Sequence, residues 1–234
     1  MKVKLVILSV FVSAFCFLLF VYPEIDLQVS SIFAKRDGQG AYAGFFLDGH
    51  PLFSGLKILA FWGSRLLAVL FIGGWIVSLF YSRDVAGLSP RAWAFLFLCL
   101  VIGPGLVANV VLKDHWGRAR PREVTYFGGT AEFTPAPLIS KECERNCSFV
   151  SGDAAFGFFL PCFAYLVPPT RRRKAFWGLM GCGAVFASAR LVMGAHFLSD
   201  IFYALVLVTI LNAVIHTMLY GRKQTLACWK EWGL

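Results

Sequence analysis

Six apolar runs dominate the 234-residue chain and leave little polar sequence between them. A transmembrane helix needs about 20 consecutive apolar residues to cross a hydrocarbon core about 30 Å thick. The chain is 58% hydrophobic and 15% charged, with a mean hydropathy of +0.69, whereas soluble domains carry about 25% charged residues. The runs predict six membrane-spanning helices, at residues 5–22, 56–81, 92–112, 154–167, 175–193 and 201–220.

This pattern predicts an all-α fold, a polytopic membrane helix bundle. No polar stretch is long enough for a second domain, so residues 1–234 are expected to form one domain. The run at 154–167 is short for a span, and we expect it to extend back through Ser151 or to rely on local thinning of the bilayer. The first run follows Lys2 and Lys4, but no small-x-small cleavage site follows it, so we expect it to stay as a helix.

The basic residues lie mostly in short loops between the apolar runs. A net charge of +9 could suggest a nucleic-acid partner, but no polar face with interleaved aromatic residues accompanies it. Short loops rich in Lys and Arg are typical of the cytoplasmic side. These loops contain Lys2 and Lys4, Arg83 and Arg91, Arg171 to Lys174, and Arg222 and Lys223. Both termini are therefore expected in the cytoplasm, with loops 23–55 and 113–153 outside.

The outer loop that follows the third run nevertheless begins with cations, in the segment KDHWGRARPR at residues 113–122. The planar guanidinium of Arg120 matches phosphate oxygens, and the ammonium of Lys113 adds a point charge. The cluster predicts an anionic substrate. The alternative is that these are interfacial side chains that bind lipid head groups without specificity.

A second cluster, Ser151-Gly152-Asp153, opens the fourth apolar run. Small and capping residues at the start of a helix leave backbone N–H groups free to bind an anion. Such a helix start is common, so this signal is weak when taken alone.

A third cluster combines Arg190, His196 and Asp200 around a turn. Residues four apart share a face of a helix, so Asp200 is expected to accept a hydrogen bond from one ring nitrogen of His196 and to fix its tautomer. The other nitrogen would then be free to attack phosphorus. Arg190 ends a predicted span, where an ionisable residue is a functional candidate by default.

The order and spacing of these residues resemble the three-part signature of the type 2 phosphatidic acid phosphatase superfamily. The signature residues in this chain are Lys113, Arg120, Pro121, Ser151, Gly152, Arg190, His196 and Asp200. The segments KDHWGRARP, NCSFVSGDA and GAHFLSD are most similar to those of bacterial lipid A phosphatases, particularly enzymes acting on the 4′ position. The resemblance covers nearly the whole chain and implies a multi-pass protein of the bacterial inner membrane whose active site faces the periplasm.

The resemblance also implies roles for these residues. The implied phosphate ligands are Lys113, Arg120, Arg190, Ser151 and Gly152. His196 would attack phosphorus, Asp200 would orient it, and water would release phosphate from the phosphohistidine without a metal or other cofactor. No pair of acidic residues at metal-ligand spacing lies beside the motifs.

Two positions depart from the family pattern. Asp153 stands where the family usually has a histidine that protonates the leaving oxygen, and Ala189 stands where it usually has serine. Either Asp153 donates that proton as a carboxylic acid with a raised pKa, or another group or water does. An inactive protein that only binds phospholipid is a further alternative.

Cys143 and Cys147 lie close together in the outer loop. A disulfide between them is plausible if the loop faces an oxidising compartment, but the sequence leaves the pairing open. Zinc binding would need further Cys or His residues nearby, and none is present.

Several functions remain open at this stage. The first is a lipid A 4′-phosphatase, which would reduce the negative charge of lipopolysaccharide and weaken its attraction for cationic antimicrobial peptides. Related alternatives are a lipid A 1-phosphatase and a phosphatase for undecaprenyl pyrophosphate or phosphatidylglycerophosphate. A non-catalytic lipid-binding or transport protein is an alternative of another class, although the two matching halves typical of transporters are not seen.

Overall fold

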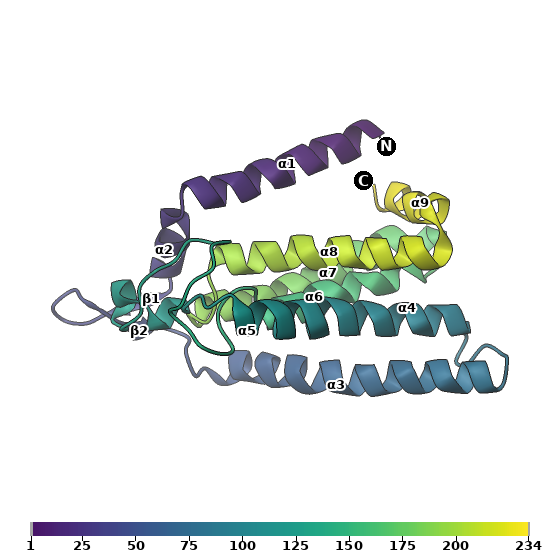
Figure 1. Ribbon diagram of the computed structural model, residues 1–234, viewed down its shortest axis with the longest axis horizontal. Helices are drawn as coiled ribbons and strands as arrows, with labels where there is room; N and C mark the ends of the chain where they lie inside the picture. The colour runs from purple at the N-terminus through teal and green to yellow at the C-terminus, as the bar shows by residue number, and fades with distance from the viewer. Residues whose placement is uncertain (1, 234) are drawn as a thin grey trace.

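The computed structural model describes residues 2–233, so Met1 and Leu234, the ends of the expected domain 1–234, lie outside the described residues. Helices make up most of the protein, which confirms the predicted all-α class (Figure 1). The elements are α1 (Lys2–Val21), α2 (Glu24–Ser31), β1 (Ala34–Arg36), β2 (Tyr42–Phe45), α3 (Pro51–Phe80), α4 (Pro90–Leu100), η1 (Val101–Leu112), α5 (Lys113–His115), η2 (Pro121–Glu123), η3 (Thr125–Phe127), α6 (Gly152–Phe159), η4 (Leu160–Tyr165), α7 (Pro169–Val192), α8 (Leu198–Tyr220) and α9 (Arg222–Trp232). Of the η elements, η1 is a π-helix and the others are 3-10 helices.

Five helical segments within residues 2–233 are long and apolar enough to cross a membrane. They are Val3–Val21 in α1, Pro51–Phe80 in α3, Pro90–His115 across α4, η1 and α5, Pro169–Val192 in α7, and Leu198–Tyr220 in α8. Helices α1 and α3 leave most of their apolar side chains exposed. Lipid is the natural solvent for such faces, because a helix satisfies its own backbone hydrogen bonds inside hydrocarbon.

The fourth predicted span is helical but shorter than the other five. Residues 152–165 form the eight-residue α6 and the six-residue η4, which together fall short of the ~20 residues that a full span needs. All of α6 except Asp153 is buried. The segment therefore packs inside the bundle and need not match the thickness of the bilayer.

Helices α6 and α7 meet at two glycines. A Cβ atom on Gly157 would lie 2.8 Å from Cα of Gly183, and a Cβ atom on Gly183 would lie 2.8 Å from the carbonyl oxygen of Gly157. Small residues let membrane helices approach this closely. The contact fixes α6, which carries Asp153, against α7, which carries Arg190.

The third span changes helix type near its middle. Pro104 has no N–H group, and its ring would clash with the carbonyl of Leu100 in an α-helix. Residues Val101–Leu112 instead follow a wider π-helical path, a form that occurs often at functional sites. Asn109 donates from Nδ2 to the carbonyl oxygen of Pro104 at 2.7 Å. The π-helix ends at Leu112, directly before Lys113, so its path sets the position of the Lys113 side chain.

Residues 23–55, which the sequence predicts as an outer loop, form regular elements. They contain α2 and an antiparallel hairpin in which Ala34 pairs with Phe45, and Arg36 with Tyr42. Strands of three and four residues are too short to show a clear alternating pattern. The hairpin buries Phe45 against Phe127, with ring centroids 5.3 Å apart.

The two ends of the bundle carry different parts of the chain. Figure 1 shows the described ends of the chain at one end of the bundle, and Lys4 Nζ donates there to the carbonyl oxygen of Gly233 at 3.2 Å. The start of α7 lies at this end too, because Arg172 pairs with Glu231 of α9 at 2.8 Å. The opposite end carries α2, β1, β2 and α5 (Figure 1). The signature residues gather at that second end.

Candidate active site

His196 lies in the turn between α7 and α8 and is only 1% exposed. Its Nδ1 atom is 2.8 Å from the carbonyl oxygen of Ser148. A carbonyl oxygen only accepts hydrogen bonds, so Nδ1 carries the proton and Nε2 carries the lone pair. Nε2 is therefore the ring atom able to attack an electrophile.

The turn that carries His196 depends on Gly194. Its φ of 63° lies in the left-handed region, which glycine adopts without steric cost. A Cβ atom at this position would also collide with the ring of Phe45. The next residue, Ala195, donates its N–H to the carbonyl oxygen of Arg190 at 3.0 Å. The turn thus holds the backbone segments of Arg190 and His196 close together.

Asp200 does not bond to His196 in the way that the sequence predicted. Helix α8 begins at Leu198, so His196 precedes it and the four-residue helical spacing does not apply. The nearest Asp200 oxygen, Oδ2, lies 3.9 Å from Nδ1, too far for a hydrogen bond. Oδ2 instead accepts from Ser148 Oγ at 2.6 Å and from the Phe197 N–H at 2.8 Å. Asp200 therefore reaches the imidazole through Ser148.

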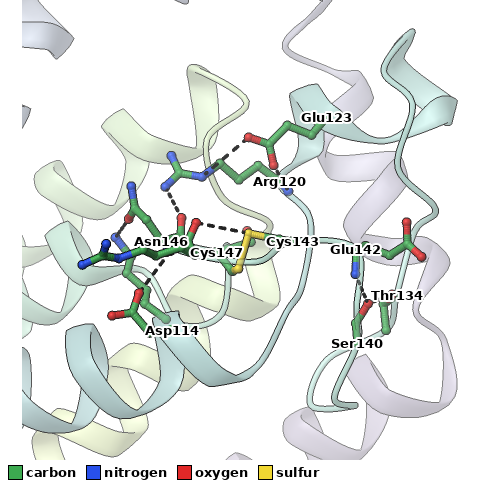
Figure 2. The surroundings of a disulfide bond; sticks show 12 residues. Asp114, Arg120, Glu123, Thr134, Ser140, Glu142, Cys143, Asn146 and Cys147 are labelled. Atoms are coloured by element: carbon green, nitrogen blue, oxygen red, sulfur yellow. Dashed lines mark hydrogen bonds and ion pairs between the residues drawn. A yellow bond between two sulfur atoms is a disulfide. The ribbon is translucent and has the colours of Figure 1, made fainter.

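Lys113 and Arg120 are both held by Asn146. Arg120 Nη2 donates to the Asn146 carbonyl oxygen at 2.7 Å, and Lys113 Nζ donates to Asn146 Oδ1 at 3.2 Å. Figure 2 shows Arg120 and Asp114 approaching Asn146 from two sides, and Asp114 accepts the Asn146 N–H at 3.1 Å. Lysine has three N–H donors and arginine five. Both cations therefore keep donors for an anion.

Arg190 and Asp153 face each other from α7 and α6. Arg190 Nε lies 2.9 Å from Asp153 Oδ2, with the side chains 6% and 23% exposed. The carboxylate lies off the N–H direction, and within residues 2–233 Nε makes no hydrogen bond. The pair is therefore held by charge alone. An incoming anion with better geometry can compete for Arg190.

Ser151 and Gly152 form the N-terminal end of α6. Ser151 caps the helix by accepting the Ala154 N–H on Oγ at 3.3 Å, and its own N–H donates to the Asp200 carbonyl oxygen at 3.3 Å. The N–H groups in the first turn of a helix have no partner inside the helix and favour an anion. A Cβ atom on Gly152 would collide with Asn109 Oδ1, so a larger residue here would have to displace the Asn109 side chain of η1.

The electrostatics of this end favour a neutral imidazole. Burial, together with the nearby cations Lys113, Arg120 and Arg190, holds the pKa of His196 well below its usual range. His196 is thus unprotonated at neutral pH. A neutral nucleophile among cations suits attack on a phosphoryl group.

Sequence reasoning missed two buried residues of the site, Arg118 and Asp26. Arg118 Nη1 lies 2.6 Å from Asp200 Oδ1, and Nη2 lies 2.8 Å from Asp26 Oδ2. Arg118 stands in the same basic segment as Arg120, but nothing in that segment marks it as buried. Asp26 lies on α2, in a loop that carries no motif, so no sequence signal points to it.

The loop between Lys113 and α6 is closed by a disulfide. Cys143 and Cys147 are bonded (Figure 2), and Asn146 lies inside the small ring that they form. The bridge therefore limits the motion of the residue that holds Lys113 and Arg120. No group of three or more His, Cys, Asp or Glu side chains that could hold a metal ion occurs within residues 2–233.

The chain is similar in sequence to known proteins. Residues 92–224 match the PAP2 superfamily. The chain is 35% identical over 231 residues to a lipid A 4'-phosphatase of Francisella tularensis subsp. novicida, an alignment that covers 94% of this chain and 97% of that protein. It is 34% and 42% identical over 191 residues to lipid A 4'-phosphatases of Rhizobium leguminosarum and Rhizobium etli, alignments that cover 77% of this chain and 81% and 73% of those proteins.

The matched region contains every predicted phosphate ligand as well as His196 and Asp200. The relatives extend the similarity to α1, α2 and the hairpin, since one alignment covers nearly the whole chain. This chain is a phosphoric monoester hydrolase of lipids with several apolar helices, and it belongs to the PAP2 superfamily.

Proposed function

We propose that the enzyme removes the 4′-phosphate of lipid A at the periplasmic face of the bacterial inner membrane, through a phosphohistidine formed on His196. The observation that supports this most directly is the buried, neutral imidazole of His196 with Lys113, Arg120 and Arg190 around it. Lipid A as the substrate is inferred from the names of three relatives.

Charge favours a phosphate anion as the bound group. The three cations Lys113, Arg120 and Arg190 outnumber the nearest carboxylates, which are Asp153 at 2.9 Å from Arg190 and Glu123 at 4.0 Å from Arg120. The remaining positive charge suits a phosphate group, and arginine presents donors in the planar arrangement that phosphate oxygens accept. The first N–H groups of α6 and the hydroxyl of Ser151 supply further donors.

In the first chemical step, Nε2 of His196 forms a bond to phosphorus as the bond from phosphorus to the sugar oxygen breaks. The leaving alkoxide takes a proton from the carboxylic acid of Asp153. The phosphorylated ring keeps its Nδ1 proton on the Ser148 carbonyl, which is 2.8 Å away. The positive charge on the ring is stabilised by the carboxylate of Asp200 at 3.9 Å.

In the second step, water attacks phosphorus on the side opposite Nε2. The Asp153 carboxylate, now unprotonated, accepts a proton from that water. Inorganic phosphate leaves and His196 returns to its neutral form. The cations stabilise the charge on the transferring oxygens in both steps, and no step requires a metal.

The periplasmic orientation rests on loop charge. The basic segments occur at the end of the bundle that carries α9 and the described ends of the chain. The start of α8, which follows the turn with His196, lies at the opposite end (Figure 1). Short loops rich in Lys and Arg favour the cytoplasm. The loop charge therefore supports an orientation with both termini in the cytoplasm and the phosphate-binding cations at the outer leaflet.

Mass spectrometry of lipid A tests the proposal. Expression in a host whose lipid A carries two phosphates should yield a species lacking one, and fragmentation should assign the loss to the 4′ position. A His196→Gln variant is the matched control and should leave both phosphates. Loss at position 1 would make the enzyme a 1-phosphatase.

If lipid A is unchanged, purified enzyme should be offered undecaprenyl pyrophosphate and phosphatidylglycerophosphate. Phosphate release from either would replace lipid A as the substrate, and tight lipid binding without release would indicate a non-catalytic protein. Each assay is repeated with EDTA. Activity lost with EDTA and restored by a divalent ion would refute the metal-free mechanism.

A further inference from the structure

Arg118 is the largest side chain that is fully buried in the described structure, at 1% exposure. Its Nε donates to the Thr134 carbonyl oxygen at 2.7 Å, and Nη1 donates to Ser199 Oγ at 2.8 Å and to Asp200 Oδ1 at 2.6 Å. Nη2 donates to Asp26 Oδ2 at 2.8 Å. All three guanidinium nitrogens are thus engaged by the protein. Arg118 therefore differs from Arg120 and Arg190, which keep donors for substrate.

Asp26 closes this network from α2 and is 1% exposed. Its Oδ1 accepts the Ser199 N–H at 2.9 Å, and its Oδ2 accepts from the Ser199 hydroxyl as well as from Arg118. Asp26 lies outside residues 92–224, the part that matches the PAP2 superfamily. The network therefore ties the segment before the family domain to the first turn of α8.

Arg118 also holds Ser148 at two points. The backbone carbonyl of Arg118 accepts the Ser148 N–H at 2.8 Å. The Arg118 guanidinium fixes Asp200, which accepts from Ser148 Oγ at 2.6 Å. Ser148 in turn presents the carbonyl oxygen that accepts from Nδ1 of His196. A continuous set of buried hydrogen bonds thus runs from Asp26 to the imidazole.

We propose that Asp26 and Arg118 are positioning residues for the nucleophile: they hold Asp200 and Ser148 so that Nδ1 of His196 stays protonated and Nε2 faces the phosphate. This inference rests on the proposed phosphohistidine mechanism. Neither side chain touches the substrate, so substrate binding is left to Lys113, Arg120 and Arg190. Weakening the network should lower kcat and leave KM nearly unchanged.

The test uses the full-length protein in detergent micelles, with ¹⁵N-labelled histidine. The chain has four histidines, and loss of one signal in His196→Gln assigns His196. In the wild type, the ¹⁵N shifts should report a protonated Nδ1 and an unprotonated Nε2. Asp26→Asn keeps the shape of the side chain but removes its charge. It should lower kcat by about tenfold, the effect of weakening one hydrogen bond to a charged group, at constant KM and shift His196 toward a mixture of tautomers.

The matched control is Glu231→Gln, which removes a partly exposed ion pair, the 2.8 Å contact to Arg172, at the other end of the bundle. It should change neither kcat nor the His196 shifts. If Asp26→Asn does not fold, Ser199→Ala removes only a hydroxyl from the same network and serves in its place.

Two outcomes overturn the inference. One is a folded variant with wild-type kcat and tautomer, and the other is a reduced kcat with an unchanged tautomer. Failure of the proposed function itself appears differently, as an inactive wild type or an active His196→Gln variant. The ¹⁵N shifts report the tautomer of His196 without any turnover of substrate. Failure of the positioning inference and failure of the proposed function are therefore distinguishable.

Discussion

The Nδ1 atom of His196 lies 2.8 Å from the carbonyl oxygen of Ser148, which fixes the proton on that side of the ring. Carboxylates often orient a catalytic histidine, and a carboxylate would stabilise a second proton on the ring more strongly than a neutral carbonyl does. With a carbonyl as the direct partner, and with cations nearby, the imidazole stays neutral. This arrangement keeps the nucleophile available over a wide range of pH.

The first prediction concerns the pH range over which the enzyme is active. A histidine must be unprotonated to attack, and a lowered pKa means that it becomes protonated only at more acidic pH. The acid limb of kcat/KM should therefore fall well below about pH 6.5, the usual histidine value. The pH profile of kcat/KM is measured with two aryl phosphates whose phosphate groups have different pKa values. An acid limb at the same pH for both substrates reports a group of the enzyme and not of the substrate. A common limb near the usual histidine value would contradict the prediction.

The second prediction concerns the phosphate ligands. Arg120→Ala and Arg190→Ala should each lower kcat/KM by about 10²-fold or more, because both act on the charge of the transferring phosphoryl group. His196→Ala should remove activity entirely. Phosphate release is measured on purified protein, and yield and thermal unfolding show whether each variant is folded. Arg36→Ala, an exposed arginine on the hairpin, is the control and should keep wild-type activity.

The sequence predicted the apolar helices and the residues that meet at His196, because both depend on local composition and spacing. It could not predict how His196 is oriented. The expected bond to Asp200 assumed one helix through both residues, whereas α8 starts after His196. The roles of Asp26 and Arg118 depend on contacts between residues 92 positions apart. Without related sequences, such long-range pairs leave no trace in a single chain.

The third prediction concerns the disulfide. Opening the bond between Cys143 and Cys147 frees Asn146, which holds Lys113 and Arg120. One or two hydrogen bonds of about 1 kcal/mol each would be weakened. KM should therefore rise by about three- to tenfold in Cys143→Ser or after treatment with dithiothreitol.

Cys182→Ser serves as the control, because Cys182 is an unpaired, exposed cysteine on α7. It should behave like the wild type. An unchanged KM in Cys143→Ser would show that Asn146 keeps its place without the bridge.

The fourth prediction concerns topology and follows from the charge of the short loops. Cysteine introduced at Lys174, in the basic first turns of α7, should react with a membrane-impermeant thiol reagent only from the cytoplasmic side. Cysteine introduced at Ile139, which is 70% exposed, should react only from outside. The opposite pattern would place His196 at the cytoplasmic face and exclude lipid A of the outer leaflet as the substrate.

The last prediction concerns Asp153, where this chain departs from the usual family pattern. Arg190 Nε lies 2.9 Å from Asp153 Oδ2, so the carboxyl group of Asp153 stands beside a predicted phosphate ligand. A bound phosphate competes for Arg190 and frees this carboxyl group. We therefore expect Asp153 to pass a proton to the leaving oxygen.

Substrates with different leaving groups distinguish a general acid role of Asp153 from a structural role. A sugar alkoxide needs a proton as the bond breaks, and general acid assistance contributes about 10²- to 10⁴-fold, whereas an aryl oxide leaves with little help. Asp153→Asn keeps the size of the side chain and removes the acid, so it should lose most activity on lipid A and much less on an aryl phosphate. The measured quantity is the ratio of kcat/KM between lipid A and the aryl phosphate. Arg190→Lys is the control, because it alters phosphate binding and should lower kcat/KM for both substrates alike. Equal losses in Asp153→Asn would assign Asp153 to positioning Arg190 and leave the proton to another group.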